Sequence, residues 1–217
     1  MSKEYYDGGN VVLRTISWKN GQRDGISKQY YYNGSIEYEV MYKNDNQNGF
    51  SKFYYKNGQL KSDETWKDGQ REGMQKSYYE KGVLQAEILF VNGKENGILK
   101  IYNENGLLIN RVVLIDGKEE GVGEMYYEDG SLHAILQFNN GKKEGKGLWY
   151  YKNGTVQTEA FYANGKREGR WTEYYENGKL KSEQIWSDGK LVKVLQNLDE
   201  NGAPVVQKIV DEDKAEL

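Results

Sequence analysis

Apolar residues in this chain recur at every second position, in short runs that end at glycine turns. In the run Ile36–Tyr42 ("IEYEVMY"), the even-numbered residues are Ile, Tyr, Val and Tyr, whereas residues 35, 37 and 39 are polar. A period of two is typical of a β-strand with one buried face. The pair Asn33-Gly34 before this run tolerates the positive φ angles of a two-residue type I′ turn. The run is therefore predicted to be one strand of a hairpin.

The same pattern returns every 24 residues. The first-turn glycines are Gly34, Gly58, Gly82, Gly106, Gly130, Gly154, Gly178 and Gly202. The second-turn glycines are Gly21, Gly69, Gly93, Gly117, Gly141, Gly165 and Gly189, with Asp45 in the missing place. A third glycine follows four residues later, at Gly25, Gly49, Gly73, Gly97, Gly121, Gly145 and Gly169. An unbroken register of this kind predicts a tandem array.

Apolar columns keep the same period. One column is Tyr30, Tyr54, Tyr78, Tyr102, Tyr126, Tyr150 and Tyr174. A second is Trp18, Tyr42, Trp66, Phe90, Leu114, Phe138, Tyr162 and Trp186. Because a single hairpin is marginal in water, we expect these columns to be buried between neighbouring copies.

These observations predict an all-β fold, an elongated, twisted antiparallel β-meander solenoid of tandem 24-residue β-hairpin repeats. We expect the charged Gly-x-x-x-Gly segment to form a second, wider reversal into the next hairpin. Residues 1–20 are predicted to be a partial repeat that caps the N-terminal end, and residues 21–188 to be seven full repeats. Residues 189–217 are predicted to be a degenerate C-terminal cap, with Leu198 in place of Tyr, followed by the acidic tail Asp211–Leu217.

The columns resemble the MORN repeat. Its plain form, with a Gly-x-x-x-Gly-x-Gly element, is matched most closely by Gly117–Gly123 and Gly141–Gly147. The Tyr-Tyr-x-x-Gly-x-Leu element, as in "YYENGKL" (residues 174–180), is similar to the bacterial variant in the YwqK family of toxin–antitoxin antitoxins. This resemblance implies an immunity protein that neutralises a cognate toxin. Other MORN-type arrays are scaffolds at membranes or within assemblies, and that alternative stays open.

Composition narrows the class of protein. Hydrophobic residues make up 37% and the net charge is -3, with 19 Tyr and 5 Trp, which favours a folded β protein over disorder. There are no cysteines, which excludes disulfides and thiolate metal sites. Residues 1–6 lack the apolar core of a signal peptide and no run is long enough for a membrane helix, so a cytoplasmic location is expected. A pI near 5.5 argues against nucleic-acid binding.

Candidate catalytic groups follow the repeat and do not interrupt it. His133 is the one histidine and stands in a variable column, so we interpret it as a solvent-facing substitution and not as a general base. A carboxylate column in the second turn is interpreted as a charged rim: Asp24, Glu72, Glu120, Glu144 and Glu168. The run Asn44–Gly49 imitates a calcium loop but has Tyr55 where a bidentate Glu is required. No enzymatic activity, metal or cofactor is expected.

A partner is expected where the repeats differ on their exposed side. Outward positions are polar in the first repeats and become apolar in the middle of the chain. The predicted partner-binding residues are Leu89, Leu107, Ile109, Val113, Met125, Tyr127 and Ile135. The alternative is that the sheet's own twist or the C-terminal tail covers them. An exposed apolar patch indicates a protein interface, and a net-acidic rim would suit a basic partner such as a toxin domain. Membrane lipid is the partner in the scaffold alternative.

Overall fold

The computed structural model describes residues 1–205, which form antiparallel β-strands without a helix among them. The predicted all-β fold of tandem hairpins is confirmed. The chain divides into two compact units, Met1–Ser131 and Leu132–Leu217. Residues 1–205 include no helix with the length and hydropathy that a membrane crossing requires. The predicted acidic tail, Asp211–Leu217, lies outside the described residues, and the predicted caps stay a prediction.

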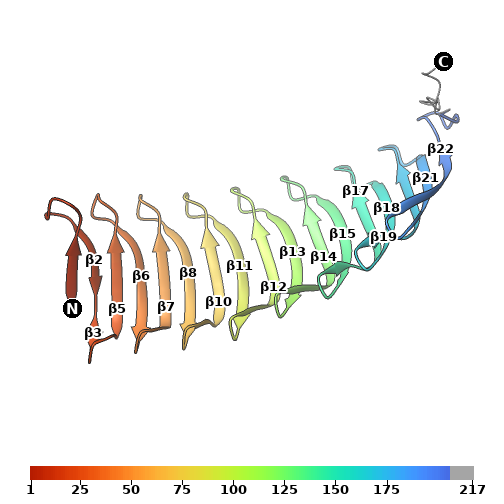
Figure 1. Ribbon diagram of the computed structural model, residues 1–217. Helices are drawn as coiled ribbons and strands as arrows, with labels where there is room; N and C mark the ends of the chain where they lie inside the picture. The colour runs from red at the N-terminus through yellow and green to blue at the C-terminus, as the bar shows by residue number, and fades with distance from the viewer. Residues whose placement is uncertain (206–217) are drawn as a thin grey trace, which may run out of the picture. The chain divides into compact units, whose positions relative to one another are not determined.

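In the first unit consecutive hairpins follow one another in chain order, from red to green in Figure 1. Its strands are β1 (Ser2–Tyr5), β2 (Val12–Ile16), β3 (Trp18–Lys19), β4 (Gln22–Arg23), β5 (Gly25–Tyr30), β6 (Ile36–Lys43), β7 (Asn46–Tyr54), β8 (Leu60–Lys67), β9 (Gln70–Arg71), β10 (Gly73–Tyr78), β11 (Leu84–Val91), β12 (Lys94–Tyr102), β13 (Leu108–Ile115) and β14 (Lys118–Tyr126).

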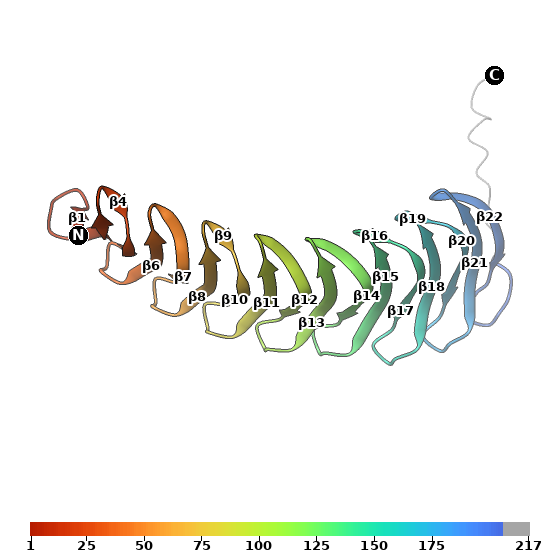
Figure 2. The same cartoon turned by 90° about the horizontal axis from the view of Figure 1, so that it is seen from below.

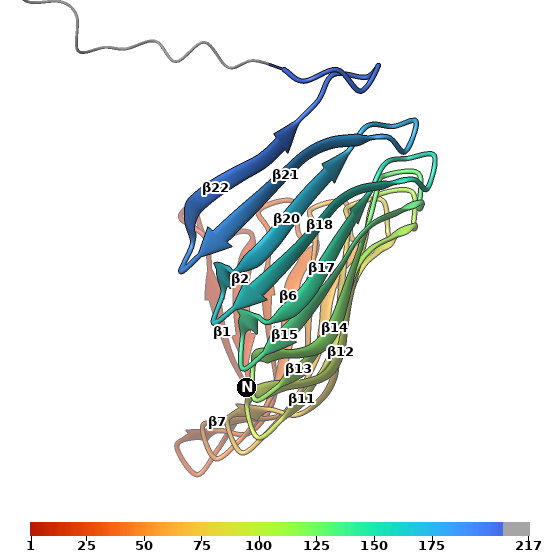
Figure 3. The ribbon, with the colours of Figure 1, turned by 90° about the vertical axis from the view of Figure 1, so that its right-hand side faces the viewer.

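The second unit repeats this arrangement, and Figure 3 shows β17, β18, β20, β21 and β22 side by side. Its strands are β15 (Leu132–Asn139), β16 (Lys142–Lys143), β17 (Gly145–Tyr150), β18 (Val156–Ala163), β19 (Lys166–Arg167), β20 (Gly169–Tyr174), β21 (Leu180–Ser187) and β22 (Lys190–Asn197).

The two kinds of turn have the opposite roles to those predicted. The second turn is the tight one: both Asn20 (φ 51°) and Gly21 (φ 80°) have positive φ, as a two-residue type I′ turn requires. At the first turn only Gly34 has positive φ, at 83°, and Tyr31 N–H donates to Ser35 C=O (2.8 Å) around a three-residue loop. Because Asn33 is not in the left-handed region, the type I′ assignment of Asn33-Gly34 is wrong. The wider reversal is this first loop.

One face of the sheet is the core, and we call it the buried face. It carries residues 38, 40 and 42 and their counterparts 24 residues on, as the alternation predicts. The strands of the first unit curve, as Figure 2 shows. In both units the buried hydrophobic side chains lie on this face: Val40, Ile88, Phe90, Val112, Leu114, Ala134, Leu136 and Ala160. The opposite side, with residues 37, 39 and 41 and their counterparts, is called the open face.

In five of the Tyr-Tyr pairs the second tyrosine links one hairpin to the next. Its hydroxyl donates to a backbone carbonyl 23 residues later: Tyr31 to Tyr54 (2.8 Å), Tyr55 to Tyr78 (2.8 Å), Tyr79 to Tyr102 (2.9 Å), Tyr151 to Tyr174 (2.9 Å) and Tyr175 to Leu198 (2.8 Å). Since the acceptor is a main-chain oxygen, its own side chain is free to vary. This explains how Leu198 can stand where the period predicts Tyr.

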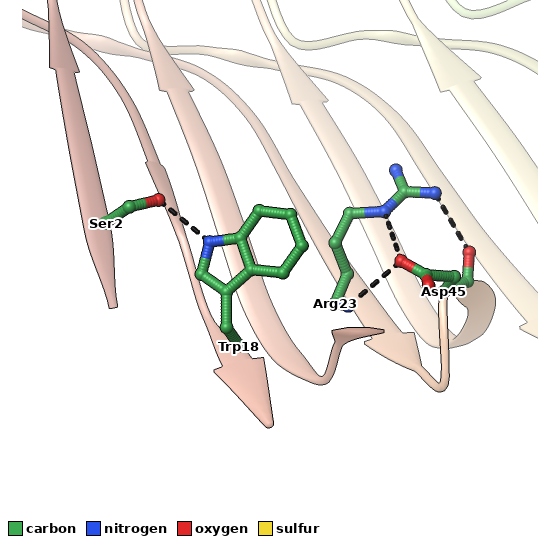
Figure 4. A network of polar contacts seen from close by, with 4 residues as sticks. All are labelled: Ser2, Trp18, Arg23 and Asp45. Atoms are coloured by element: carbon green, nitrogen blue, oxygen red, sulfur yellow. Dashed lines mark hydrogen bonds and ion pairs between the residues drawn. The ribbon is translucent and has the colours of Figure 1, made fainter. Parts of the chain in front are cut away.

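Polar contacts also bind the first two repeats together at the tight-turn edge (Figure 4). Trp18 Nε1 donates to Ser2 Oγ (2.8 Å), which links β1 to β3. Asp45 replaces the usual turn glycine and has a φ of 67°, a strained value for a residue with a side chain. Its carboxylate accepts from both Arg23 N (2.9 Å) and Arg23 Nε (3.1 Å). These bonds offset the backbone strain.

Candidate protein-binding surface

The open face of the first unit carries a ladder of ion pairs across its middle. Lys28 Nζ lies 2.5 Å from Glu39 Oε1, and Lys100 Nζ lies 2.9 Å from Glu87 Oε1. Arg111 Nη1 lies 3.1 Å from Glu124 Oε2. Opposite charges on directly paired strands stabilise a sheet modestly, so the ladder makes the middle of this face polar and ordered.

Tyrosine hydroxyls donate hydrogen bonds to two carboxylates of this ladder. Tyr54 donates to Glu39 (3.1 Å) and Tyr102 to Glu87 (3.3 Å). The hydrogen bond from Lys28 lowers the pKa of the Glu39 carboxyl, and the hydrogen bond from Lys100 does the same for Glu87. Burial, together with the nearby Glu39 charge, raises the pKa of Tyr54 to about 12.

This tyrosine pKa gives a pH prediction. The unfolded phenol ionises near pH 10, while folded Tyr54 keeps its proton until about pH 12, so the folded state binds more protons between these values. The stability from this proton is fully present below pH 10 and is lost as the pH rises through 12. We expect the free energy of unfolding of the wild type, relative to Tyr54→Phe, to fall over this interval in urea titrations. A constant difference from pH 9 to 12 would contradict the assignment.

Beside the ion-pair ladder, toward the tight turns, the open face becomes apolar. We call this surface the central strip. Its members are Met74, Leu89, Val91, Ile98, Val113, Ile115 and Val122. Ile115 is 55% exposed, Met74 50% and Val122 47%, and Val91 and Ile98 are also exposed. Side chains of this size are normally buried, and a contiguous exposed group of them marks an interaction surface.

The strip is held by the register of the strands. Met74 is paired with Leu89 between β10 and β11, and Ile98 with Val113 between β12 and β13. Between β11 and β12 the register shifts, and Leu89 lies over Gly97, where an added Cβ would meet the Leu89 Cβ at 3.8 Å. Because these contacts follow from the backbone pairing, the side chains of the central strip have one fixed arrangement before any partner binds.

The structure distributes the residues predicted for partner binding over several places. Leu89 and Val113 are half-buried members of the central strip, and Ile109 lies on the same face by alternation along β13. Met125 is on the buried face, because it is paired with Asn110. Two others stand in or beside loops: Leu107, which is 41% exposed, and Tyr127, which closes the loop to Ser131. In the second unit, Ile135 is paired with Leu148. The role of all seven in binding stays a prediction.

Sequence reasoning missed the most exposed members of the strip. A signal for three of them existed, because one column of the repeat is apolar through the first unit and becomes cationic afterwards: Ile26, Phe50, Met74, Ile98, Val122, Lys146 and Arg170. Each stands directly after the third glycine of its repeat. The face of this column follows only from the pairing partner on the neighbouring strand, such as Leu89 for Met74.

Asn103 is the most distinctive side chain near the strip. It replaces the linking tyrosine and is 5% exposed. Its Oδ1 accepts from Asn105 N and Leu107 N, both at 3.0 Å, and its Nδ2 donates to Glu128 O (2.9 Å) and Glu128 Oε2 (3.1 Å). One short amide therefore orders its own loop and keeps the link to the next hairpin.

Three carboxylates of the second-turn column have structural contacts. Glu72, Glu144 and Glu168 accept hydrogen bonds from the backbone N–H of the next tight turn, at Asn92 (2.9 Å), Asn164 (2.8 Å) and Asp188 (2.8 Å). Across residues 1–205, no group of three or more His, Asp or Glu side chains is arranged to hold a metal ion. His133 is half-buried on β15.

Comparison with known families decides the identity of the repeat. Six segments of 22 residues, together more than half of the chain, match the MORN repeat variant: 23–44, 47–68, 71–92, 119–140, 143–164 and 167–188. The chain belongs to the MORN repeat variant family. No curated protein matches this MORN array.

The matched segments leave out residues 95–116 of the MORN array. That copy contains Asn103 in place of the linking tyrosine, and it contributes Ile98, Val113 and Ile115 to the central strip. The place where the repeat departs from its family pattern is thus also the place where its open face is most apolar.

Proposed function

We propose that this MORN array is a non-catalytic binding scaffold that docks one protein partner on the central strip of its first unit. The observation that carries the proposal is the group of exposed apolar side chains on a fixed sheet face, over the copy that departs from the family pattern. Interface cores are enriched in such side chains and depleted of charge. A surface already ordered by strand pairing loses little entropy on binding.

The finer form of the proposal is that the partner is a cognate toxin and that the array is its antitoxin, acting in the cytoplasm. It rests on the similarity of "YYENGKL" and its counterparts to the YwqK type of repeat. The mechanism needs stoichiometric binding only: the partner's apolar surface covers the central strip, and its active surface is occluded. No chemical step by the array is required.

A double variant that introduces two charges into the central strip tests the docking surface. Ile98 and Val113 face each other, so Ile98→Lys combined with Val113→Glu places opposite charges side by side in the partner's footprint. The matched control is Ile26→Lys with Met41→Glu, the same pairing positions in the first repeat. The ligand is the protein that co-purifies with the tagged wild-type array. We expect the central variant to bind it at least tenfold more weakly, because the loss of a central interface residue has an effect of this size, and the control to bind like the wild type.

The antitoxin form has its own readout. The co-purified protein should arrest growth when expressed alone, and the wild-type array should restore growth while the central variant does not. A partner that is harmless alone would overturn the antitoxin form and leave the scaffold. Equal loss in both variants would overturn the central strip, and binding to lipid vesicles without a protein partner would favour a membrane scaffold.

A further inference from the structure

The buried face of the second unit carries an aromatic group that the proposed function does not use. Trp149 lies against Trp171 (ring centroids 6.0 Å apart) and Tyr162 (6.2 Å), and Trp171 lies against Trp186 (6.3 Å). All four rings are only half-buried. The floor between them is made of small residues, among them Gly147 and Ala160, which are paired across β17 and β18. The rings therefore border a surface that is still open to solvent.

Two cations are set on these rings. The Arg167 guanidinium lies 4.1 Å from the Trp171 ring centroid and 4.5 Å from that of Trp186. The Lys143 ammonium lies 5.3 Å from the Tyr162 ring centroid. A stacked guanidinium uses its flat faces for the rings and keeps its N–H edge for a carboxylate. Within residues 132–205, no ion pair joins Lys143 or Arg167 to an acidic side chain.

The repeat itself does not require cations at these positions. The same column carries Glu95 and Glu119 in the two preceding copies. Two cations on the open face of this unit, by contrast, are paired: Lys146 with Glu159 (3.3 Å) and Arg170 with Glu183. On the buried face Glu173 already accepts from Trp171 Nε1 (3.1 Å) and Ser182 Oγ (3.1 Å). Lys143 and Arg167 are the cations of this unit's aromatic group that an external anion could meet.

We propose that this aromatic and cationic surface of the second unit binds an extended acidic peptide segment of a partner protein. Arg167 and Lys143 are one repeat apart, which is two strand spacings or roughly 10 Å. Carboxylates three residues apart in a chain of polyproline II conformation point to the same side and lie about 9 Å apart. Arg167 takes one carboxylate on its N–H edge, Lys143 takes the other, and the half-exposed rings of Trp149 and Tyr162 contact the peptide between them.

An acidic peptide fits this surface better than single-stranded nucleic acid. In proteins that bind single-stranded nucleic acid, the bases stack on exposed aromatic faces. Here Arg167 already lies on faces of both Trp171 and Trp186 and is within hydrogen-bonding reach of the Tyr162 hydroxyl, so its remaining N–H groups are suited to contact with a carboxylate. This surface is independent of the central strip and of the proposed function.

Tryptophan fluorescence tests the proposal with a defined probe. The probe is a twelve-residue peptide of four Glu-Ser-Thr units, and its control has Gln in place of Glu. We expect saturable quenching with the Glu peptide, none with the Gln peptide, and at least fivefold weaker binding for Arg167→Gln and for Lys143→Gln. The matched variant Arg170→Gln, on the following strand β20 and on the opposite face, should bind like the wild type.

Each other outcome overturns the proposal. Equal binding of the Glu and Gln peptides, or no binding of either, means that these cations do not select carboxylates. An equal loss in Arg170→Gln means that net charge alone is responsible, and binding of an oligo-dT strand without binding of the Glu peptide assigns the surface to nucleic acid. Should Arg167→Gln fail to fold by circular dichroism, Lys143→Gln decides the result.

Discussion

Replacing Asn103 with aspartate is expected to lower the free energy of unfolding by about 2–3 kcal/mol, the magnitude for losing hydrogen bonds that include a charged group. The Asn103 amide donates to both the carbonyl and the carboxylate of Glu128, at 2.9 Å and 3.1 Å. An aspartate has no donor to give them, and it places a second negative charge beside Glu128 in a largely buried position. The loop bonds to Asn105 N and Leu107 N would survive, because a carboxylate still accepts them.

Urea unfolding of the variant at neutral pH measures this effect. Asn105→Asp is the matched control, since it adds the same charge two residues away on an exposed side chain. We expect the control to stay within about 0.5 kcal/mol of the wild type. Lowering the pH should restore part of the free energy of unfolding lost in Asn103→Asp, because protonation of the introduced carboxylate restores a hydrogen-bond donor. A variant as stable as the control would mean that the Glu128 contacts contribute nothing.

Gly147→Val is expected to destabilise the second unit by about 1–3 kcal/mol through overpacking. Gly147 is buried, and a Cβ there would lie 2.9 Å from Leu136 Cδ2 and 3.0 Å from two atoms of the Trp149 ring. It is not among the residues with positive φ, so the penalty comes from packing and not from backbone strain. We expect Gly147→Ala to lose less than Gly147→Val, in thermal unfolding followed by circular dichroism.

Lys146→Val is the matched control for this site. It introduces the same side chain one residue away on the opposite face and removes a surface ion pair to Glu159, which contributes little. Its unfolding temperature should change much less than that of Gly147→Val. If both variants behave alike, β-propensity and not packing at Gly147 determines the result.

Much of the fold was predictable from the period and the alternation of apolar residues. The roles of the two turns were not, because Asn-Gly occurs in both. A discriminating signal was nevertheless present. The residue before the glycine of the tight turn is always Asn or Asp, which tolerate positive φ, whereas the first turn has Lys81 in that place. A lysine there argues against a type I′ turn, and the structure confirms a three-residue loop closed between Tyr79 and Val83.

The candidate surface was predictable only in part, for a geometric reason. A strict period of two assigns faces within one strand, but the turn between two strands decides which of their residues share a face. Leu89 and Val113 follow the alternation of the runs that begin at Leu84 and Leu108, and they lie on the expected side. The two-residue turn pairs Ile115 with Lys118, so Met125 is paired with the even-numbered Asn110 and lies on the buried face. A side chain on the adjoining strand needs its pairing partner before its face can be assigned.

The linking bonds have a consequence for how such a chain can change over time. The linking tyrosine hydroxyls reach a main-chain oxygen 23 residues on, and the capped tight turns are tied to a glutamate of the copy just before them. The tyrosine bonds require no particular side chain at the acceptor, the cap bonds require none at the donor, and neither depends on the number of copies beyond the neighbour. Loss or duplication of one whole 24-residue segment inside a unit would leave every donor opposite an equivalent acceptor. Unequal recombination can therefore lengthen or shorten the binding face in whole steps, while single-residue insertions would break the register at once.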